Sequence, residues 1–341
     1  MTMDRGVDTP PPTRTDDDIA PRIRAAVDAG ELRGVPTGPV ERLGAGESYT
    51  AWRVGSGEQA RVLRLPRRPP HDLPRPMEAE FEVLRRVPPE LGTSAVALEA
   101  GSDNPLGTPY MVTTHVPGRA LRATDWNPRL ATALAHQIAH LHAALAAAPA
   151  PSAAFVPSAG EQGEELVTWW REHHPETLTD PRVCALLPAW RHELDRLAPA
   201  FEAVPTHPLI HGDAVATNVI LGPDGLPRLI DFEWSGPGDT AKDLALIGGR
   251  VTGGPWYLPM TPDDVTAFVT EYSRYSRSSR RSRLAQDTGA ADPQRLLERR
   301  EAYELLDRLG NLLYCLSRPG EARYGRWADE LARSLTARLG G

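Results

Sequence analysis

The chain has 341 residues, a formal net charge of −7, 40% hydrophobic residues and 24% charged residues, which is usual for a globular protein. Its acidity argues against a nucleic-acid partner, and no apolar run approaches the roughly 20 residues of a transmembrane helix. Because Cys184 and Cys315 are too few for a disulfide framework or a thiolate metal site, we expect a cytoplasmic protein.

The length predicts two domains, since about 150 residues per domain is usual. Residues 1–18 carry no secretory signal and are expected to form a disordered tail. Residues 19–116 predict a small lobe with one antiparallel sheet. Its expected elements, in chain order, are a helix from Ile19, three strands within Gly38–Pro66, a helix over Pro76–Val87 and a strand within Leu106–Gly118.

Residues 117–341 predict a mainly helical second lobe. Helices are expected from Pro128 and over residues 161–172, 185–201, 262–275, 294–316 and 326–339, and only residues 209–234 are expected to interrupt them with strands. The Ser/Arg-rich run 273–283 is interpreted as a mobile surface loop.

The segment 209–234 concentrates the polar residues that chemistry requires. Asp213 ends a short apolar run, and Asn218 follows five positions later. Two strands, Val219–Leu221 and Pro227–Ile230, are then joined by Gly-Pro-Asp-Gly, which favours a tight hairpin. The hairpin would return the chain so that Asp231 lies beside Asn218. Two carboxylates and an amide would then meet, as Mg²⁺-dependent phosphoryl transfer needs.

At these residues the sequence resembles the aminoglycoside phosphotransferase and choline kinase-like enzymes, which are small-molecule relatives of the protein kinases. The resemblance rests on "HGDAVATN" followed by "IDFE". It implies an α+β, bilobal, protein-kinase-like fold with a small antiparallel-sheet N-lobe and a mainly helical C-lobe. It also implies Asp213 as catalytic base, His211 as the residue that orients the loop, Asn218 and Asp231 as Mg²⁺ ligands, and ATP or GTP with Mg²⁺ as cofactors.

Nucleotide binding is expected from the first lobe. Gly44 and Gly46 lie between the first two predicted strands, where backbone can approach phosphate, and Ser48 offers a hydroxyl donor. The cation expected on the third strand is Arg64, since the chain's single lysine, Lys242, lies elsewhere.

The resemblance extends this nucleotide site in three further places. It pairs Glu80 with Arg64, although Glu78 and Glu82 are near competitors. It places backbone groups of Thr114, His115 and Val116 at the adenine edge, and it makes Asp243 a buried carboxylate that braces the catalytic loop. The helix histidines His136 and His140 are spaced like a zinc pair, but a third ligand is lacking, so a structural role is favoured.

The acceptor is expected to be a small polar molecule, most readily an aminoglycoside or another cationic antibiotic. Glu233, Glu304 and Asp307 are the candidate carboxylates, and the last two share one helix face. A kinase of a small metabolite (choline, a sugar or homoserine), a non-catalytic nucleotide-binding module and a peptide-binding helical scaffold are the alternatives. The oligomeric state stays open.

Overall fold

The computed structural model describes residues 16–146, 158–202, 204, 208–277 and 292–340. They form two compact units. The N-terminal unit holds the described residues up to Pro117 together with Ile230–Ser235, and the C-terminal unit holds Gly118–Leu229 and the described residues from Gly236 onward. Most of the predicted tail, residues 1–15, lies outside the described residues.

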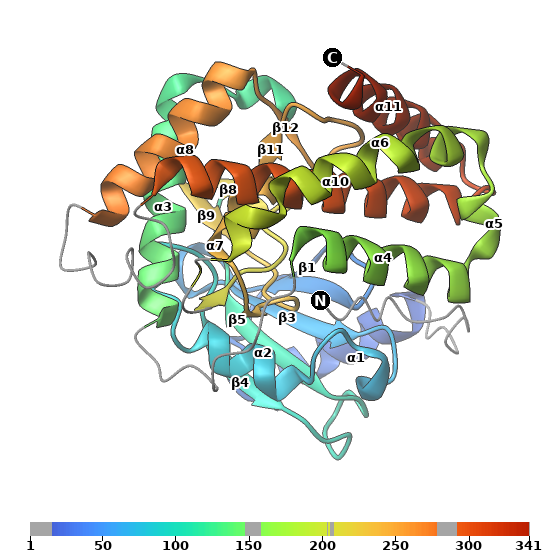
Figure 1. Ribbon diagram of the computed structural model, residues 1–341. Helices are drawn as coiled ribbons and strands as arrows, with labels where there is room; N and C mark the ends of the chain where they lie inside the picture. Colours follow the sequence, from blue (N-terminus) through green and yellow to red (C-terminus); the bar gives the residue numbers. More distant parts are fainter. Residues whose placement is uncertain (1–15, 147–157, 203, 205–207, 278–291, 341) are drawn as a thin grey trace. The chain divides into compact units, whose positions relative to one another are not determined.

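The N-terminal unit is built on one antiparallel sheet of five strands in the order β1-β2-β3-β5-β4 (Figure 1). Each predicted strand of this unit is present, and β4 is additional. The bounds are α1 Asp16–Asp28, β1 Val40–Ala45, β2 Tyr49–Val54, β3 Arg61–Pro66, α2 Met77–Leu84, β4 Ala95–Glu99 and β5 Tyr110–Thr114.

Helix α1 covers one face of this sheet. Apolar side chains of the helix and of alternate strand positions form one buried core: Ile19, Ile23, Ala26, Val27, Trp52, Val54, Leu63, Leu65, Tyr110 and Val112. Because side chains alternate along a strand, Leu63 and Leu65 face α1 while Arg64, between them, points to the opposite face. The helix begins at Asp16, three residues before the predicted start at Ile19.

The C-terminal unit is mainly helical, and all of its predicted helices are present (Figure 1). The short helices α5 and α7 were not predicted. The bounds are α3 Pro128–Ala146, α4 Ala159–His173, α5 Pro175–Leu178, α6 Pro181–Leu197, α7 Thr240–Leu246, α8 Pro262–Arg277, α10 Pro293–Leu316 and α11 Ala322–Leu339.

The predicted hairpin is confirmed as β8 (Val219–Leu221) and β9 (Pro227–Leu229), which pair antiparallel. Strand β7, Leu209–Ile210, lies within residues 209–234 as expected. Short strands outside that range correct the expectation that only residues 209–234 interrupt the helices; they are β6 Arg119–Ala120, β10 Gly236–Pro237, β11 Gly248–Gly249 and β12 Leu258–Pro259. The loop expected over 273–283 is also corrected in part, because residues 273–277 form the last turn of α8. Residues 278–283 lie outside the described residues.

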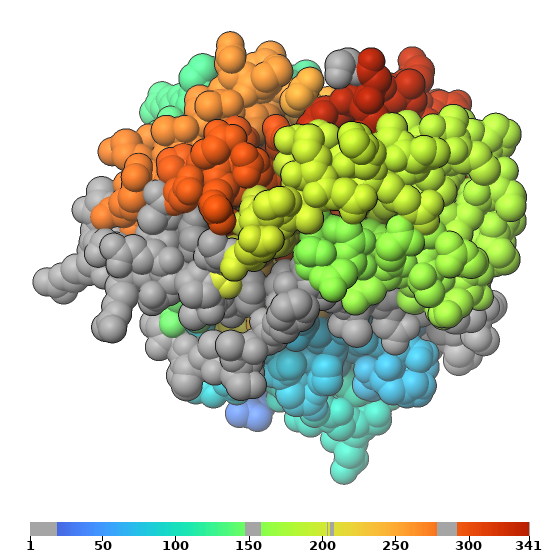
Figure 2. Space-filling model, in the orientation of Figure 1, coloured from blue at the N-terminus to red at the C-terminus, as the bar shows by residue number. Residues whose placement is uncertain are grey.

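Helix α10 is the central element of the C-terminal unit. It packs against α4, α6, α7, α8 and α11, and the Leu305 carbonyl accepts a hydrogen bond from the buried Trp190 indole of α6 at 2.9 Å. Figure 2 shows α4 and α6 side by side at the surface of this unit.

An ion-pair cluster ties α6 to α11. Glu193 accepts hydrogen bonds from Arg196 at 2.8 Å and from Arg338 at 3.0 Å. These guanidinium groups, Arg196 foremost, lower the pKa of Glu193 from 4.5 to about 2. A carboxylate with a depressed folded-state pKa stabilises the fold above its ordinary pKa and loses that effect as the pH falls.

We therefore expect Glu193→Gln to lower the free energy of unfolding at pH 7 by about 1–2 kcal/mol, allowing for the partial exposure of the cluster. The difference from the unsubstituted protein should shrink as the pH falls from 4.5 toward 2. Urea unfolding followed by circular dichroism between pH 7 and pH 3 measures it. A difference that stays constant over this range would contradict the assignment.

Candidate functional site

The segment after β7 forms a tight loop around Asp213. Gly212 has φ +82°, a left-handed conformation that glycine adopts without strain. The Asp213 backbone N–H donates to Nδ1 of the buried His211 at 3.2 Å, and the Asp213 carbonyl accepts from the Val215 N–H at 2.8 Å. These contacts fix the loop, while the Asp213 side chain itself remains partly exposed.

Asn218 completes this loop from the end of a 3-10 turn over Ala216–Asn218. Its Nδ2 donates to the Asp213 carboxylate Oδ2 at 2.8 Å and to the Asp213 carbonyl at 3.0 Å. With Nδ2 held in this way, the acceptor of the amide, Oδ1, is directed away from these contacts. An oxygen of this kind is suited to a hard cation.

Asp243 braces the loop of Asp213 by accepting backbone hydrogen bonds from it, as the resemblance implies. Its side chain is buried, its Oδ2 accepts the His211 N–H and its Oδ1 accepts the Gly212 N–H, both at 2.8 Å. Burial favours a raised pKa for Asp243, but the hydrogen bond and charge of His142, the charge of His211 and the Gly212 N–H outweigh it and lower the pKa. The brace is therefore an ionised carboxylate.

In the N-terminal unit, Arg64 is buried and makes three contacts. Its Nη1 is paired with the buried Glu80 of α2, and its Nη2 donates to Asp231 Oδ1 at 2.7 Å. Its guanidinium also lies 4.2 Å from the ring centroid of Tyr49, a cation–π distance. The structure thus selects Glu80 from the three glutamates considered for this role, because Glu78 and Glu82 are exposed.

These contacts keep Arg64 charged. Burial alone would lower its pKa, but Glu80 and then Asp231 raise it. Because both nitrogens of the guanidinium fork are used by different carboxylates, the planar group is held in one orientation. Tyr49 was not predicted to belong to this site. In the sequence only its position next to Ser48 indicated that it could lie there.

Asp231 adopts a strained backbone. Its φ is +66°, and it is the one residue other than glycine with positive φ among the described parts of the chain. Such a conformation is uncommon for a side chain larger than hydrogen and costs of order 1–3 kcal/mol. Strain of this kind gathers at functional sites, and here it accompanies the residue expected to bind metal.

Glu233 lies two residues further along the same segment. Burial, and then the charge of Asp231, raise its pKa to about 8, although Arg64 and a hydrogen bond with the Ser48 side chain oppose the shift. The Ser48 contact links the glycine-rich turn to the segment that carries Asp231. Glu233, a candidate for binding the acceptor, therefore lies among the charged side chains around Arg64.

The glycine-rich turn, residues 44–46, has open space next to its backbone. A Cβ atom at Gly44 would meet no described atom within 4 Å, and one at Gly46 would meet only the Tyr49 carbonyl, at 3.9 Å. The Gly46 N–H donates to that carbonyl at 2.9 Å. Packing within the unit would therefore allow a side chain at either position. The absence of side chains leaves room for a ligand to approach the backbone.

The expected adenine-binding segment follows β5. The Thr114 N–H donates to Ser94 at 2.9 Å, and the His115 N–H reaches the Ala60 carbonyl at 3.4 Å. Burial and then Arg53 lower the pKa of His115. Val116 makes no backbone hydrogen bond with any described residue, so its backbone is the group most able to meet a base edge.

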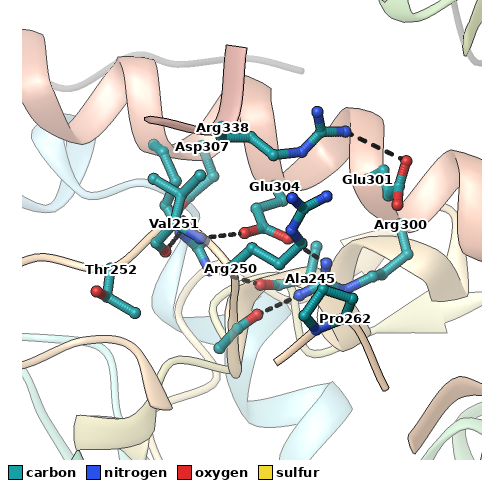
Figure 3. A network of polar contacts seen from close by, with 12 residues as sticks. Ala245, Arg250, Val251, Thr252, Pro262, Arg300, Glu301, Glu304, Asp307 and Arg338 are labelled. Atoms are coloured by element: carbon teal, nitrogen blue, oxygen red, sulfur yellow. Dashed lines mark hydrogen bonds and ion pairs between the residues drawn. The ribbon is translucent and has the colours of Figure 1, made fainter. Parts of the chain in front are cut away.

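Two acceptor candidates lie on α10. Glu304 is buried, pairs with Arg300 and accepts the Val251 N–H at 2.6 Å (Figure 3). Asp307 Oδ2 accepts the Tyr257 hydroxyl at 2.6 Å and pairs with Arg308 at 2.8 Å, but its side chain keeps 15% exposure. Glu304 therefore has a structural role in the fold, whereas the Asp307 carboxylate is still accessible to solvent.

The histidine pair has other contacts. His136 Nε2 lies 2.6 Å from Glu271, its ring stacks on Tyr275, and His140 Nε2 is hydrogen-bonded to the Tyr275 hydroxyl. Among the described residues no group of three or more His, Cys, Asp or Glu side chains is arranged to hold a metal. No described helix is long and apolar enough to cross a bilayer.

The donor set expected for Mg²⁺ is divided between the two units. Asn218 belongs to the C-terminal unit and Asp231 to the N-terminal unit. An amide oxygen and a carboxylate are ligands of the type that a hard cation selects, so the residues fit the group. Their convergence on one ion stays a prediction.

Comparison with known proteins gives three informative matches. The chain is 32% identical over 158 residues to viomycin phosphotransferase of Streptomyces vinaceus, a match that covers 43% of this chain and 51%, about half, of that relative. The choline kinase of Cryptosporidium parvum has a TM-score of 0.57 at 13% identity, with 89% of each chain covered. A thermostable mutant of the aminoglycoside phosphotransferase APH(4)-Ia, in ternary complex with ADP and hygromycin B, has a TM-score of 0.52 at 16% identity and covers 89% of this chain and 94% of its own.

The two structural matches show the fold that the resemblance implied. Residues 39–284 match the sequence model of one enzyme family, and this range is more than half of the chain and contains Arg64, Asp213, Asn218 and Asp231. The chain belongs to the phosphotransferase enzyme family.

Proposed function

We propose that the protein is an ATP- and Mg²⁺-dependent O-phosphotransferase that inactivates a cationic antibiotic. The observation that carries the proposal is that two charged side chains are held in fixed orientations. Asn218 holds the Asp213 carboxylate, and Glu80 and Asp231 hold the Arg64 guanidinium. The relatives that act on or bind viomycin and hygromycin B support an antibiotic as the acceptor. A cytoplasmic location is part of the proposal.

The nucleotide would lie against the N-terminal unit. The backbone at Gly44 and Gly46 and the Ser48 hydroxyl would receive phosphate oxygens, the Arg64 guanidinium would neutralise the α- and β-phosphates, and the adenine edge would meet Thr114, His115 and Val116. Asn218 and Asp231 would hold the Mg²⁺ that neutralises charge on the triphosphate. Asp231 would then exchange its Arg64 contact, in whole or in part, for the ion.

The chemical step needs little from the protein beyond position and a proton acceptor. An acceptor hydroxyl oxygen attacks the γ-phosphorus, the bond from that phosphorus to the β–γ bridging oxygen breaks, and ADP leaves. The proton of the hydroxyl passes to the Asp213 carboxylate. Asn218 keeps that carboxylate turned in one direction, and His211 keeps the loop in register.

The acceptor would be drawn by carboxylates of the C-terminal unit. The Ala216 N–H donates to the Trp256 carbonyl at 2.7 Å, so the loop of Asp213 is joined to the segment that directly precedes β12. The next residue, Tyr257, donates to Asp307. Asp307 is therefore connected to the loop of Asp213 through two hydrogen bonds, and we assign it the role of binding an acceptor ammonium group. Glu304, which is buried and paired with Arg300, is assigned a role within the fold.

The test is phosphoryl transfer to a defined panel. Purified protein is incubated with Mg²⁺, with ATP or GTP, and with viomycin, hygromycin B, gentamicin, kanamycin, choline or homoserine, and mass spectrometry measures the addition of one phosphate. Transfer to an antibiotic supports the proposal. Transfer to choline or homoserine alone would make the protein a metabolite kinase, and nucleotide binding without any transfer would make it a binding module.

Replacement of Asp307 tests the acceptor site. Asp307→Asn keeps a hydrogen-bond acceptor for Tyr257 but removes the charge, which is worth about 1.5–3 kcal/mol in a bond to a cation. We expect the KM of the cationic acceptor to rise about tenfold or more, with the KM of ATP unchanged. Asp329→Asn, at an exposed carboxylate of α11 paired with Arg182, is the control. Equal acceptor KM values in the two variants would refute the assignment.

A further inference from the structure

The glycine-rich turn is held from the side by the segment that follows β3. The Arg67 N–H donates to the Ser48 carbonyl at 2.7 Å, and Nη1 of the Arg67 guanidinium donates to the Gly46 carbonyl. We propose that Arg67 is a positioning residue, which fixes the peptide group between Gly46 and Glu47 so that its N–H can receive a phosphate oxygen. The inference rests on the proposed function, because it concerns the nucleotide site assigned there.

Glycine makes this peptide group the variable part of the turn. Gly46 has no Cβ, so its backbone can adopt conformations that other residues avoid, and a rotation of the peptide group that follows it costs little. The bond is trans, so the Gly46 carbonyl and the Glu47 N–H point in opposite directions. A flip would exchange the two, and a carbonyl oxygen, which repels phosphate, would then be presented where an N–H is needed.

The Arg67 guanidinium favours one of these two orientations. A guanidinium donates hydrogen bonds and accepts none, so it can bind the Gly46 carbonyl but not an N–H. With the carbonyl directed at Arg67, the Glu47 N–H is directed away from it. After a flip the guanidinium would face an N–H, and the hydrogen bond would be lost. The contact therefore stabilises the orientation in which the N–H is presented on the side away from Arg67.

Prolines on both sides of Arg67 restrict the backbone from which it reaches the turn. Arg67 and Arg68 lie between Pro66 and the pair Pro69–Pro70. Proline fixes its own φ and keeps the residue before it extended, so this short segment has few backbone conformations. The hydrogen bond from the Arg67 N–H to Ser48 continues the pairing of β2 with β3. The Arg67 backbone is therefore already fixed, and only its side chain has to be ordered for the contact with the turn.

The neighbouring Arg68 offsets a charge that the turn itself carries. Glu47 brings a carboxylate to a turn that would bind phosphate, and like charges repel. Nη2 of Arg68 lies 3.7 Å from Oε2 of Glu47, and both side chains are at least partly exposed. Exposed pairs of this kind contribute little to stability. We therefore assign Arg68 to the charge balance of the turn, and the orientation of its backbone to Arg67.

Amide hydrogen exchange of the full chain without nucleotide and calorimetric binding of Mg²⁺·ATP test the inference together. The Arg67 side chain is exposed, so Arg67→Met should fold. The Gly46 N–H is protected by its bond to the Tyr49 carbonyl at 2.9 Å and reports the mobility of the turn. We expect it to exchange about three- to tenfold faster in Arg67→Met, and the Kd of Mg²⁺·ATP to rise by a similar factor, for the loss of one exposed hydrogen bond to a charged group. Arg67→Lys, which keeps a charged donor, should recover part of both.

Arg68→Met is the matched control, because it removes the same charge from the next residue and leaves the Gly46 contact in place. Its Gly46 exchange should stay within about twofold of that of the unsubstituted protein. The inference is overturned if Gly46 exchanges alike in the two methionine variants. It is also overturned if Arg67→Met weakens nucleotide binding with unchanged exchange, because Arg67 would then contact phosphate directly. Faster Gly46 exchange in a protein that binds neither ATP nor GTP would uphold the hold of Arg67 on the turn and overturn the proposed function.

Discussion

Asp213→Ala should reduce kcat by about 10²–10⁴-fold, the usual contribution of a positioned general base. The KM of ATP should change little, because the carboxylate is assigned to the acceptor hydroxyl and not to the nucleotide. The side chain is partly exposed, so the variant should remain folded. Steady-state kinetics of ADP release, measured with the acceptor identified by the panel, give both constants.

Asp213→Asn makes this test sharper. The amide has the shape of the carboxylate and can present its oxygen to Asn218 Nδ2, but it has no basic oxygen to receive a proton. If Asp213 acts as a base, the asparagine variant should be as slow as the alanine variant. If the residue only shapes the loop through Asn218, the asparagine variant should retain most of the rate.

Asp224 supplies a matched control for Asp213. It lies in the turn of the same hairpin segment, and its carboxylate pairs with Arg228 at the surface, at 2.6 Å. Asp224→Asn removes the same charge from the same region, and we expect kcat within about twofold because exposed ion pairs contribute at most about 1 kcal/mol. A similar loss of rate in both variants would mean that local charge, and not a base, is responsible.

The parts of the fold that were predicted correctly are those with local causes. The Gly-Pro-Asp-Gly turn specifies the β8–β9 hairpin within the eleven residues Val219–Leu229, and helical spacing alone identifies α3, α8 and α10. Strand β4 was missed because "AVALE" is short and rich in alanine, so it carries little β-propensity of its own. It is a strand because β5 offers it an edge, which is a tertiary cause.

The candidate site divides in the same way. The order of Asp213, Asn218 and Asp231 is visible in the sequence, since one short segment holds all three. The contacts that orient these residues are not visible in the sequence. His142 of α3 is hydrogen-bonded both to Asp243 of α7 and to Tyr272 of α8, and Tyr49 of β2 contacts Arg64 of the neighbouring strand β3. A single sequence indicates the candidate reactive groups, while the residues that orient them depend on packing between distant elements.

Arg64→Met should be the most destabilising of the proposed changes. It leaves the Glu80 carboxylate buried without its partner, and an uncompensated buried charge costs about 3–5 kcal/mol. The matched control is Arg53→Met on the neighbouring strand β2, where the ion pair with Glu41 is exposed and worth at most about 1 kcal/mol. Chemical unfolding of both variants at pH 7 compares the two losses, and equal losses would contradict the buried role.

Arg64→Lys tests why this chain uses arginine. A lysine ammonium is a point charge and cannot direct two nitrogens at Glu80 and Asp231 while it lies flat against the Tyr49 ring. We expect it to lose about 1.5–3 kcal/mol, the value of one charge-assisted hydrogen bond, and to raise the KM of ATP. Wild-type behaviour of the lysine variant would show that the fork geometry is dispensable.

The double variant Arg64→Met/Glu80→Met separates stability from catalysis at this position. Replacement of both members of a buried ion pair by apolar side chains is often neutral or stabilising, so the free energy of unfolding should return toward that of the unsubstituted protein. Phosphoryl transfer should not return, because the double variant lacks the guanidinium that we propose binds the α- and β-phosphates. If activity recovered together with stability, Arg64 would be a packing group only, and the strained Asp231 beside it would need another explanation.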